Sequence, residues 1–298
     1  MKSMLYRHLI VAPIVLLLAA CHEEGHNSAV VDVPDDPRGI WYVNDPASTE
    51  TIDHAVWDSF LQKYHHENPY GDGVNRIAYF EVSDEDREAL DQYVRALGRT
   101  PIATYNREEQ IPYWMNLYNA AIVKMVLDNL PVNSVLQIRG PGINVVGPWL
   151  TPVATVHGKS VSFNDIEHYI LRAAFDDMDP PVHYGLNCAS IGCPPIAPRA
   201  HTAANWRENL AKSARQFVNS EQGLRIEDGE LYTSKVYHSW FKEDFGGTDD
   251  LVLAHVKKYC NGTVAAQLEG HTEIAGDYYD WRLNKMEEGS VVGEVADE

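Results

Sequence analysis

The sequence predicts an α+β fold, a mainly helical single domain with a small, mostly antiparallel sheet. Apolar residues recur at helical spacing through most of the chain, so helices should outnumber strands. The extended segments are short, and most of them fall in the second half of the chain. Turn residues inside two of these segments indicate hairpins, which pair strands in the antiparallel sense. Helices and strands segregated in this way are typical of α+β domains.

Helices are expected where apolar side chains repeat every three or four residues. The predicted helices, in chain order, are 51–66, 83–97, 107–129, 162–175, 202–218 and 249–259. Ser83, with Asp86 three residues later, forms a capping pattern, and Ser162 is the expected cap of the fourth helix. The helix 107–129 is apolar on almost every side, which is typical of a helix buried at the centre of a domain.

Extended segments are expected where apolar residues alternate or concentrate between turn signals. These segments are 77–82, 148–161, 182–186, 224–233 and 271–283. Two of them should fold back as hairpins, because turn residues interrupt them at His157-Gly158-Lys159 and at Asp228-Gly229.

The first twenty residues have the parts of a secretory signal. Lys2 and Arg7 give a positive start, and the apolar run that follows is too short to span a bilayer, which needs about 20 residues. The run ends in Leu18-Ala19-Ala20-Cys21, the pattern that precedes a lipidated cysteine. We therefore expect a lipid on Cys21 that anchors the chain stably in a membrane. His22, where a retention signal would have Asp, favours the outer membrane.

These signals divide the chain into four segments. They are a signal peptide (1–20), a lipidated N-terminus with a flexible tether (21–47), a globular domain (48–284) and an acidic disordered tail (285–298). The expected location is the cell envelope, as an outer-membrane lipoprotein that faces the periplasm or the cell surface.

Composition excludes several classes of function. The formal net charge of −19 would repel phosphate backbones, so nucleic acid is not an expected partner. The chain has no phosphate-binding loop, no Gly-x-Ser-x-Gly elbow and no His-Glu-x-x-His, and we expect no cofactor. The expected partners are a membrane, through the lipid anchor, and an unidentified small-molecule or peptide ligand.

The cysteines are the most informative residues for chemistry. With Cys21 used by the lipid, Cys188, Cys193 and Cys260 remain, an odd number for an oxidising compartment. Cys188 can be a nucleophile, half of a disulfide or an inert core residue. Its spacing from Cys193 is not that of a Cys-x-x-Cys redox motif, although a local disulfide is sterically allowed. The spacing matches no strong zinc motif, and we expect no metal site.

Two imidazoles are candidate bases for a Cys188 nucleophile. His183 precedes Cys188 by five positions on the predicted strand 182–186, which would place the two side chains on opposite faces. His168, on the predicted helix 162–175, is geometrically freer to be the partner. Glu167 and Asn116 are the expected orienting or polarising groups.

Five motifs stand in order along the globular segment. They are YWMNLYNA at 113–120, IEHYILR at 166–172, HYGLNC at 183–188 with CP at 193–194, DF at 244–245 and YDWRLN at 279–284. Together they resemble the family called domain of unknown function 547 (DUF547), and the resemblance runs from about residue 48 to 284. The chain looks like a bacterial lipoprotein member of that family. Relatives can lack the counterpart of Cys193 while they keep that of Cys188, which implies that a bridge is not required by the fold.

The leading hypothesis is a cysteine-dependent hydrolase or acyltransferase of the envelope, with Cys188 as nucleophile and His168 or His183 as base. The alternative is a non-catalytic binding or scaffold module, in which Cys188 is buried or bridged. A third hypothesis is a redox protein that uses Cys188 and Cys193.

Overall fold

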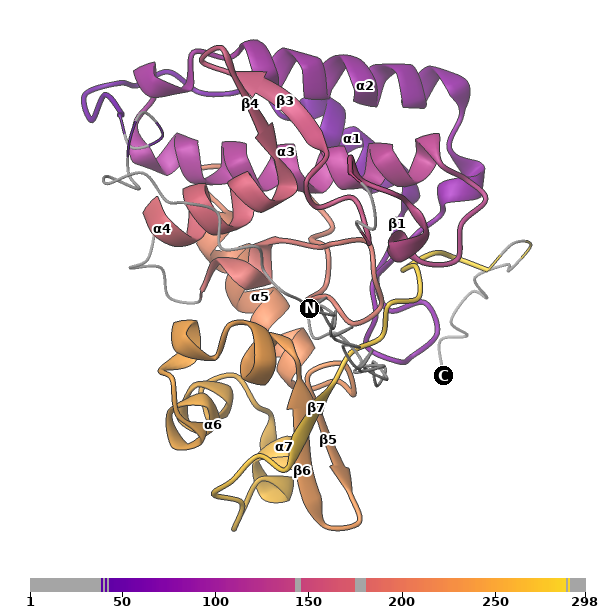
Figure 1. The fold of residues 1–298 in the computed structure, drawn as a ribbon, viewed down its shortest axis with the longest axis vertical. Coiled ribbons are helices and arrows are strands. Elements are labelled where there is room, and N and C mark those ends of the chain that lie inside the picture. The colour runs from indigo at the N-terminus through magenta and orange to yellow at the C-terminus, as the bar shows by residue number, and fades with distance from the viewer. Residues whose placement is uncertain are drawn as a thin grey trace, which may run out of the picture. The chain divides into compact units, whose positions relative to one another are not determined.

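A long helix, α3 (Arg107–Asp128), is buried along most of its length. All its side chains from Tyr113 to Val123 are buried, as its apolar sequence predicts. The helix α2 (Asp84–Arg99) packs along α3, and α1 (Ala55–Tyr64) packs against α2. Figure 1 shows these three helices together at one end of the described part of the chain.

The structure is a computed structural model that describes residues 39, 41, 43–142, 146–174, 181–287 and 289. The predicted signal peptide, Cys21 with its expected lipid, and most of the predicted tether and tail lie outside these ranges. Within them, no helix is both long enough and apolar enough to cross a membrane.

Both predicted serine caps are present. Ser83 Oγ accepts a hydrogen bond from the backbone N–H of Asp86 at 3.2 Å, and Ser162 Oγ accepts one from that of Asp165, also at 3.2 Å. Each cap satisfies one of the N–H groups that the first turn of a helix leaves unpaired. The sequence therefore predicts the starts of these two helices well.

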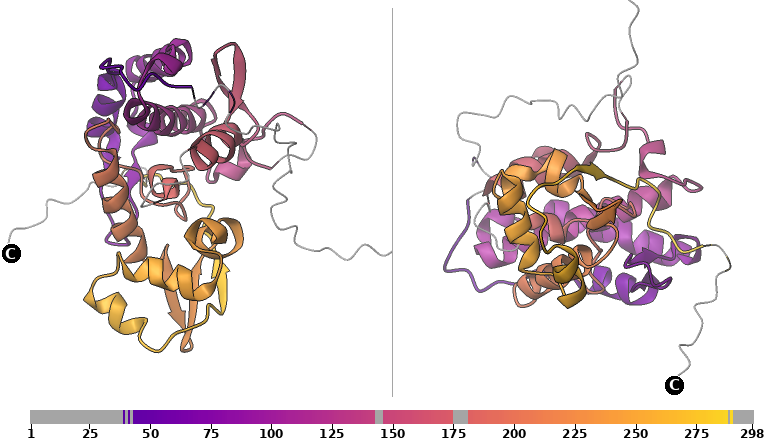
Figure 2. Two further views of the ribbon diagram at one scale, coloured as in Figure 1. Left: turned by 90° about the vertical axis from the view of Figure 1, so that its left-hand side faces the viewer. Right: turned by 90° about the horizontal axis from the view of Figure 1, so that it is seen from below.

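The small sheets are mostly antiparallel, which confirms the predicted α+β class. The strands pair as β1 (His65–His66) with β2 (Arg76–Ile77), β3 (Pro152–Val156) with β4 (Lys159–Ser162), and β5 (Leu224–Glu227) with β6 (Glu230–Ser234), and β7 (Gly276–Tyr278) is parallel to β6. Both predicted hairpin turns occur: His157, Asp228 and Gly229 have φ of 50°, 51° and 84°. Figures 1 and 2 show the β5–β6–β7 sheet at the end opposite α2 and α3.

Further helices lie in the described part. They are η2 (Tyr79–Glu81), η3 (Ile102–Thr104), η4 (Val135–Gln137), α5 (Trp206–Val218), η8 (Lys242–Phe245), α6 (Asp249–Lys257) and α7 (Gly262–Gln267).

The predicted strand at 182–186 is wrong. The segment forms a 3₁₀ helix, η6 (Val182–Gly185), and all four residues are buried. A segment that is buried on every side has no alternation of apolar and polar residues, so its sequence does not distinguish a strand from a helix. Gly185 packs against α3 so closely that a Cβ there would lie 2.8 Å from Met115 Sδ. Tertiary packing therefore decides the conformation of this segment.

The predicted helix 162–175 is correct in place but unusual in form. Its main part, η5 (Asp165–Leu171), is a π-helix, followed by one turn of α-helix, α4 (Arg172–Ala174). A second π-helix, η7 (Val236–Trp240), follows β6. π-Helical segments are rare and frequently occur at functional sites.

Candidate functional site

Cys188 and Cys193 form a disulfide, with their Cα atoms 6.2 Å apart. Cys188 is partly exposed, whereas Cys193 is 8% exposed. The third cysteine in the described residues, Cys260, is free. Of the three alternatives for Cys188, the structure shows the bridged one, so its sulfur is not a thiol here.

A network of buried asparagines holds the segment that carries the disulfide. Asn119, on α3, donates from Nδ2 to the carbonyl of Gly185 at 2.8 Å and accepts at Oδ1 from the backbone N–H of Asn187 at 2.9 Å. Asn187 donates to the carbonyl of Pro194 at 2.8 Å, and Asn284 donates to Asn187 Oδ1 at 3.1 Å. The loop is thus fixed both to α3 and to the C-terminal part of the chain.

The residues 279–284, which we call the C-terminal strap, pair with the backbone of the disulfide loop. The N–H of Ile191 donates to the carbonyl of Arg282 at 2.8 Å, and that of Gly192 donates to Asp280 at 2.9 Å. A Cβ on Gly192 would lie 2.8 Å from the backbone nitrogen of Asp280, so this close approach requires glycine. The strap brings Tyr279 to the sulfurs.

Two hydroxyl groups contact the disulfide. Tyr279 Oη lies 3.0 Å from both Cys188 Sγ and Cys193 Sγ, and Ser190 Oγ lies 3.0 Å from Cys188 Sγ. The two hydroxyls are 2.8 Å apart. Burial raises the pKa of Tyr279, so its hydroxyl keeps its proton at neutral pH and can donate to sulfur.

An ionised cluster surrounds His183, which is 3% exposed. Its Nε2 lies 2.7 Å from Asp244 Oδ2, its Nδ1 lies 3.7 Å from Glu167 Oε1, and its ring stacks on Phe241 at 3.9 Å between centroids. Arg172 donates to both oxygens of Asp244, at 2.6 and 2.8 Å. The imidazole thus lies between two carboxylates.

The neighbouring charged groups keep both carboxyl groups of the cluster, Asp244 and Glu167, ionised. Burial opposes ionisation of Asp244, but hydrogen bonds from His183 and Arg172 outweigh it and hold the pKa of this carboxyl well below its usual range. Burial also opposes ionisation of Glu167, yet His183 and His168 together lower the pKa of Glu167. Burial lowers the pKa of His168. Both carboxylates are therefore charged at neutral pH.

The predicted pairing of Cys188 with an imidazole is not seen. Within the described ranges, no hydrogen bond joins either sulfur of the bridge to a histidine. His168 Nδ1 lies 3.2 Å from Arg172 instead. His183 lies on the helix η6, so the strand geometry that was expected to place it on the face opposite Cys188 does not apply. Glu167 accepts a hydrogen bond from Tyr118 Oη at 3.3 Å.

Asn116, expected to orient or polarise a reacting group, has a structural role instead. Its side chain is fully buried, donates to the carbonyl of His201 at 2.7 Å and accepts from the N–H of His201 at 3.0 Å. Both ends of the amide are used by the backbone of a single residue, His201, which explains a buried amide on an apolar helix.

Sequence reasoning did not assign Asp244 and Tyr279 to the site. Both lie in motifs of the DUF547 resemblance, which was the one signal that marked them. Asp244 is 61 residues from His183, and Tyr279 is 91 residues from Cys188, so no local pattern connects them.

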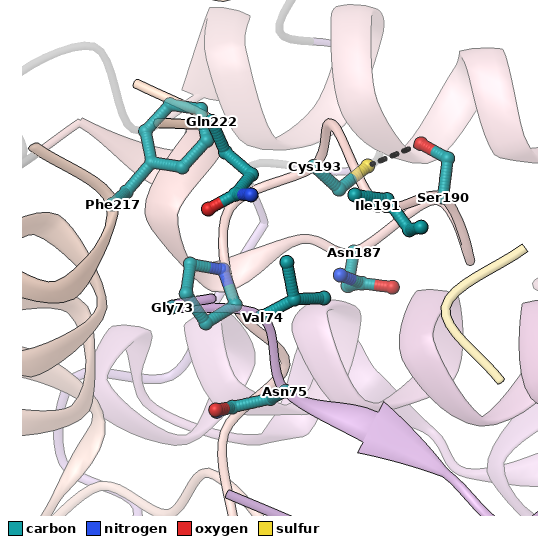
Figure 3. Close-up of a pocket in the computed structure, with 10 residues that line it drawn as sticks. Gly73, Val74, Asn75, Asn187, Ser190, Ile191, Cys193, Phe217 and Gln222 are labelled. Atoms are coloured by element: carbon teal, nitrogen blue, oxygen red, sulfur yellow. Dashed lines mark hydrogen bonds between the residues drawn. The ribbon is translucent and has the colours of Figure 1, made fainter. Parts of the chain in front are cut away.

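A narrow crevice lies beside Cys193, lined also by Asn187, Ser190 and Phe217. Figure 3 shows Ser190 Oγ directed at Cys193 Sγ, 3.6 Å away. The crevice has no room for a water molecule, so it is not a substrate pocket. The described residues also contain no cluster of three or more His, Cys, Asp or Glu side chains that could hold a metal ion.

The fold and the site define an α+β domain with a hydroxyl-lined disulfide beside a charged histidine cluster. Residues 102–218 match the family described as "Protein of unknown function, DUF547". DCN1-like protein 4 of Danio rerio is 30% identical over 102 residues, which are 33% of this chain and 35% of that relative. The chain thus spans about a third of that relative. No solved structure matches the chain.

Proposed function

We propose that the Cys188–Cys193 bridge is redox-active and exchanges with the thiols of a cysteine-containing polypeptide. The observation that carries this proposal is the position of Tyr279 Oη, 3.0 Å from both sulfurs, with Ser190 Oγ beside it. Hydroxyl donors stabilise a thiolate, and a stabilised thiolate is both a better leaving group and a more abundant nucleophile. Cys188 is the more exposed residue of the pair and is the one that a partner attacks.

The exchange proceeds in two steps. A thiolate of the partner attacks Cys188 Sγ, the bond to Cys193 breaks, and its electron pair leaves on Cys193, which Tyr279 stabilises as a thiolate. A second thiolate of the partner then attacks the partner's sulfur in the mixed disulfide and releases Cys188. The partner is oxidised by two electrons to a disulfide, and the two cysteines take up the protons that the partner's thiols released.

Acyl transfer or hydrolysis by Cys188 has less support from this geometry. It requires a free thiolate and a base, and the sulfurs contact hydroxyl groups rather than an imidazole within the described part of the chain. It stays a prediction for the reduced protein. A bridge that never opens in the native protein would instead support the binding or scaffold module.

Equilibration in glutathione buffers of graded potential tests the redox proposal. We expect the native bridge to open and close reversibly with a midpoint above about −300 mV, since structural disulfides lie below that value. The Tyr279→Phe variant should have a more negative midpoint potential than the wild type. The thiolate loses a hydrogen-bond donor, so the reduced form is less stable relative to the disulfide. Acid quenching, alkylation and mass spectrometry measure the fraction reduced.

Tyr278→Phe is the matched control, since the hydroxyl of Tyr278 has no hydrogen-bond partner in the described residues. It should leave the midpoint unchanged. A bridge that opens only after unfolding, or a midpoint that Tyr279→Phe leaves in place, would contradict the proposal.

We further propose that the chain is an outer-membrane lipoprotein, supported by the lipobox-like sequence that ends at Cys21. Expressed with its first 20 residues, the protein should fractionate with membranes, and Cys21→Ser should release it. Mass spectrometry of the N-terminal peptide should show an acylated Cys21. An unmodified N-terminus on an exported protein would argue against the anchor.

A further inference from the structure

A second cavity, of about 350 Å³, lies between α2, α3 and the start of β3. The hairpin β3–β4 crosses the two helices in Figure 1. At Gly98 the hairpin approaches α2 closely, since a Cβ there would lie 3.4 Å from Ala154 Cβ and from the carbonyl of Thr155. Val94 and Arg95, in the C-terminal half of α2, line the cavity. Its volume is at the lower end of the range for small-molecule sites.

Part of the cavity lining is apolar, and these residues come from several elements. Its apolar residues are Val94, Ala121, Met125, Ile138, Pro152 and Val153. A small organic molecule bound there can bury apolar surface against these side chains. Each Å² of apolar surface removed from water contributes about 25 cal/mol to the free energy of binding.

The charged groups of the cavity carry an excess of positive charge. Asp91 pairs with Arg95 and, at 3.4 Å, with Lys124, and Lys124 pairs at 2.5 Å with Asp128. Arg139 lines the same cavity and forms no ion pair with any residue in the described ranges. Three cationic side chains thus face two carboxylates, in a chain whose formal net charge is −19.

We infer that this cavity binds a small organic monoanion, with one carboxylate on an apolar body. The carboxylate pairs with Arg139, whose planar guanidinium matches its geometry with two parallel hydrogen bonds. The apolar body lies against Met125, Ile138 and Val153. One negative charge on the ligand balances the one excess positive charge of the lining. The second charge of a dianion would have no cation to pair with and would be repelled by Asp91 and Asp128. The inference is independent of the cysteine chemistry.

Calorimetric titration of the full chain with octanoate, below its micelle concentration, tests the inference. We expect saturable binding of one octanoate, and Arg139→Gln should weaken it at least tenfold, which corresponds to about 1.4 kcal/mol. The neutral probe 1-octanol should bind the wild type and Arg139→Gln equally, because it presents no charge to Arg139.

Arg99→Gln is the matched control, since it removes the same charge from an exposed residue of α2 that does not line the cavity. It should leave octanoate affinity unchanged. Val153→Phe fills the cavity and should abolish binding of both probes, which keeps the test decisive if Arg139→Gln does not fold. Absence of saturable binding, equal affinity in all variants, or an equal loss in Arg99→Gln would overturn the inference.

Discussion

Asn119→Leu is expected to destabilise the protein by several kcal/mol, although the two side chains are similar in size. The substitution leaves the carbonyl of Gly185 and the N–H of Asn187 without the partners that Asn119 gives them at 2.8 and 2.9 Å. Asn119 is 2% exposed, so water cannot replace those bonds. Each buried group left unpaired costs about 1–3 kcal/mol, which gives about 2–6 kcal/mol for the two. Urea unfolding followed by tryptophan fluorescence measures the loss.

Asn129→Leu provides the comparison, since Asn129 is exposed and bonds only locally, to the carbonyl of Met125. It should change the free energy of unfolding by less than about 1 kcal/mol. If Asn119→Leu cost no more than this control, the asparagine network would not be what fixes the disulfide loop.

Mild acid is expected to destabilise the protein before its carboxylates titrate. Burial lowers the pKa of His54 and of His201 from 6.5 to about 4, and these residues are 5% and 2% exposed. Within the described part of the chain, Nε2 of His54 has no hydrogen-bond partner, and at His201 burial outweighs the favourable backbone carbonyl of Gly185, so the charged form of each ring is disfavoured.

The sign of the effect follows from proton binding. Between pH 6.5 and about 4 the unfolded chain binds protons at these histidines and the folded chain does not, so stability falls as the pH falls. Above pH 6.5 the contribution is fully present. Each histidine contributes up to about 3 kcal/mol across this window.

Urea unfolding at a series of pH values from 7.5 to 4.5 measures this slope. His201→Gln should flatten it, because glutamine does not titrate. His157→Gln is the control, since His157 is an exposed turn residue and should leave the slope as it is. An unchanged slope in His201→Gln would show that another group takes up the protons.

Local patterns predict the parts of this fold that local physics decides. Ser83 and Ser162 fix helix starts because a cap needs only residues within the first turn. Asp228-Gly229 fixes a hairpin because its backbone needs positive φ. The segment 182–185 and the π-helical form of 165–171 depend on packing against distant elements, which no window of the sequence contains.

Sequence patterns point to some residues of the candidate site and not to others. They point to Glu167, His183 and Cys188, and the structure places Glu167 near His183 and joins Cys188 to Cys193. Tyr279 and Asp244 come from far along the chain, and only three-dimensional packing brings them to Cys188 and His183. A buried amide that binds backbone and one that polarises a substrate have the same sequence signal, so the sequence alone does not distinguish these two roles for Asn116.

The C-terminal strap lies outside the residues that match the family, although it contacts the disulfide loop inside them. Residues 102–218 contain both cysteines and His183, yet the partners of the loop backbone at Ile191 and Gly192 lie in 279–284. A fragment cut to the similarity boundaries would retain the sulfurs while it lost Tyr279, Asp244 and the hydrogen bonds that shape the loop. Residues 102–218 placed in another protein would therefore carry the disulfide and His183 without the side chains that contact them from outside this range.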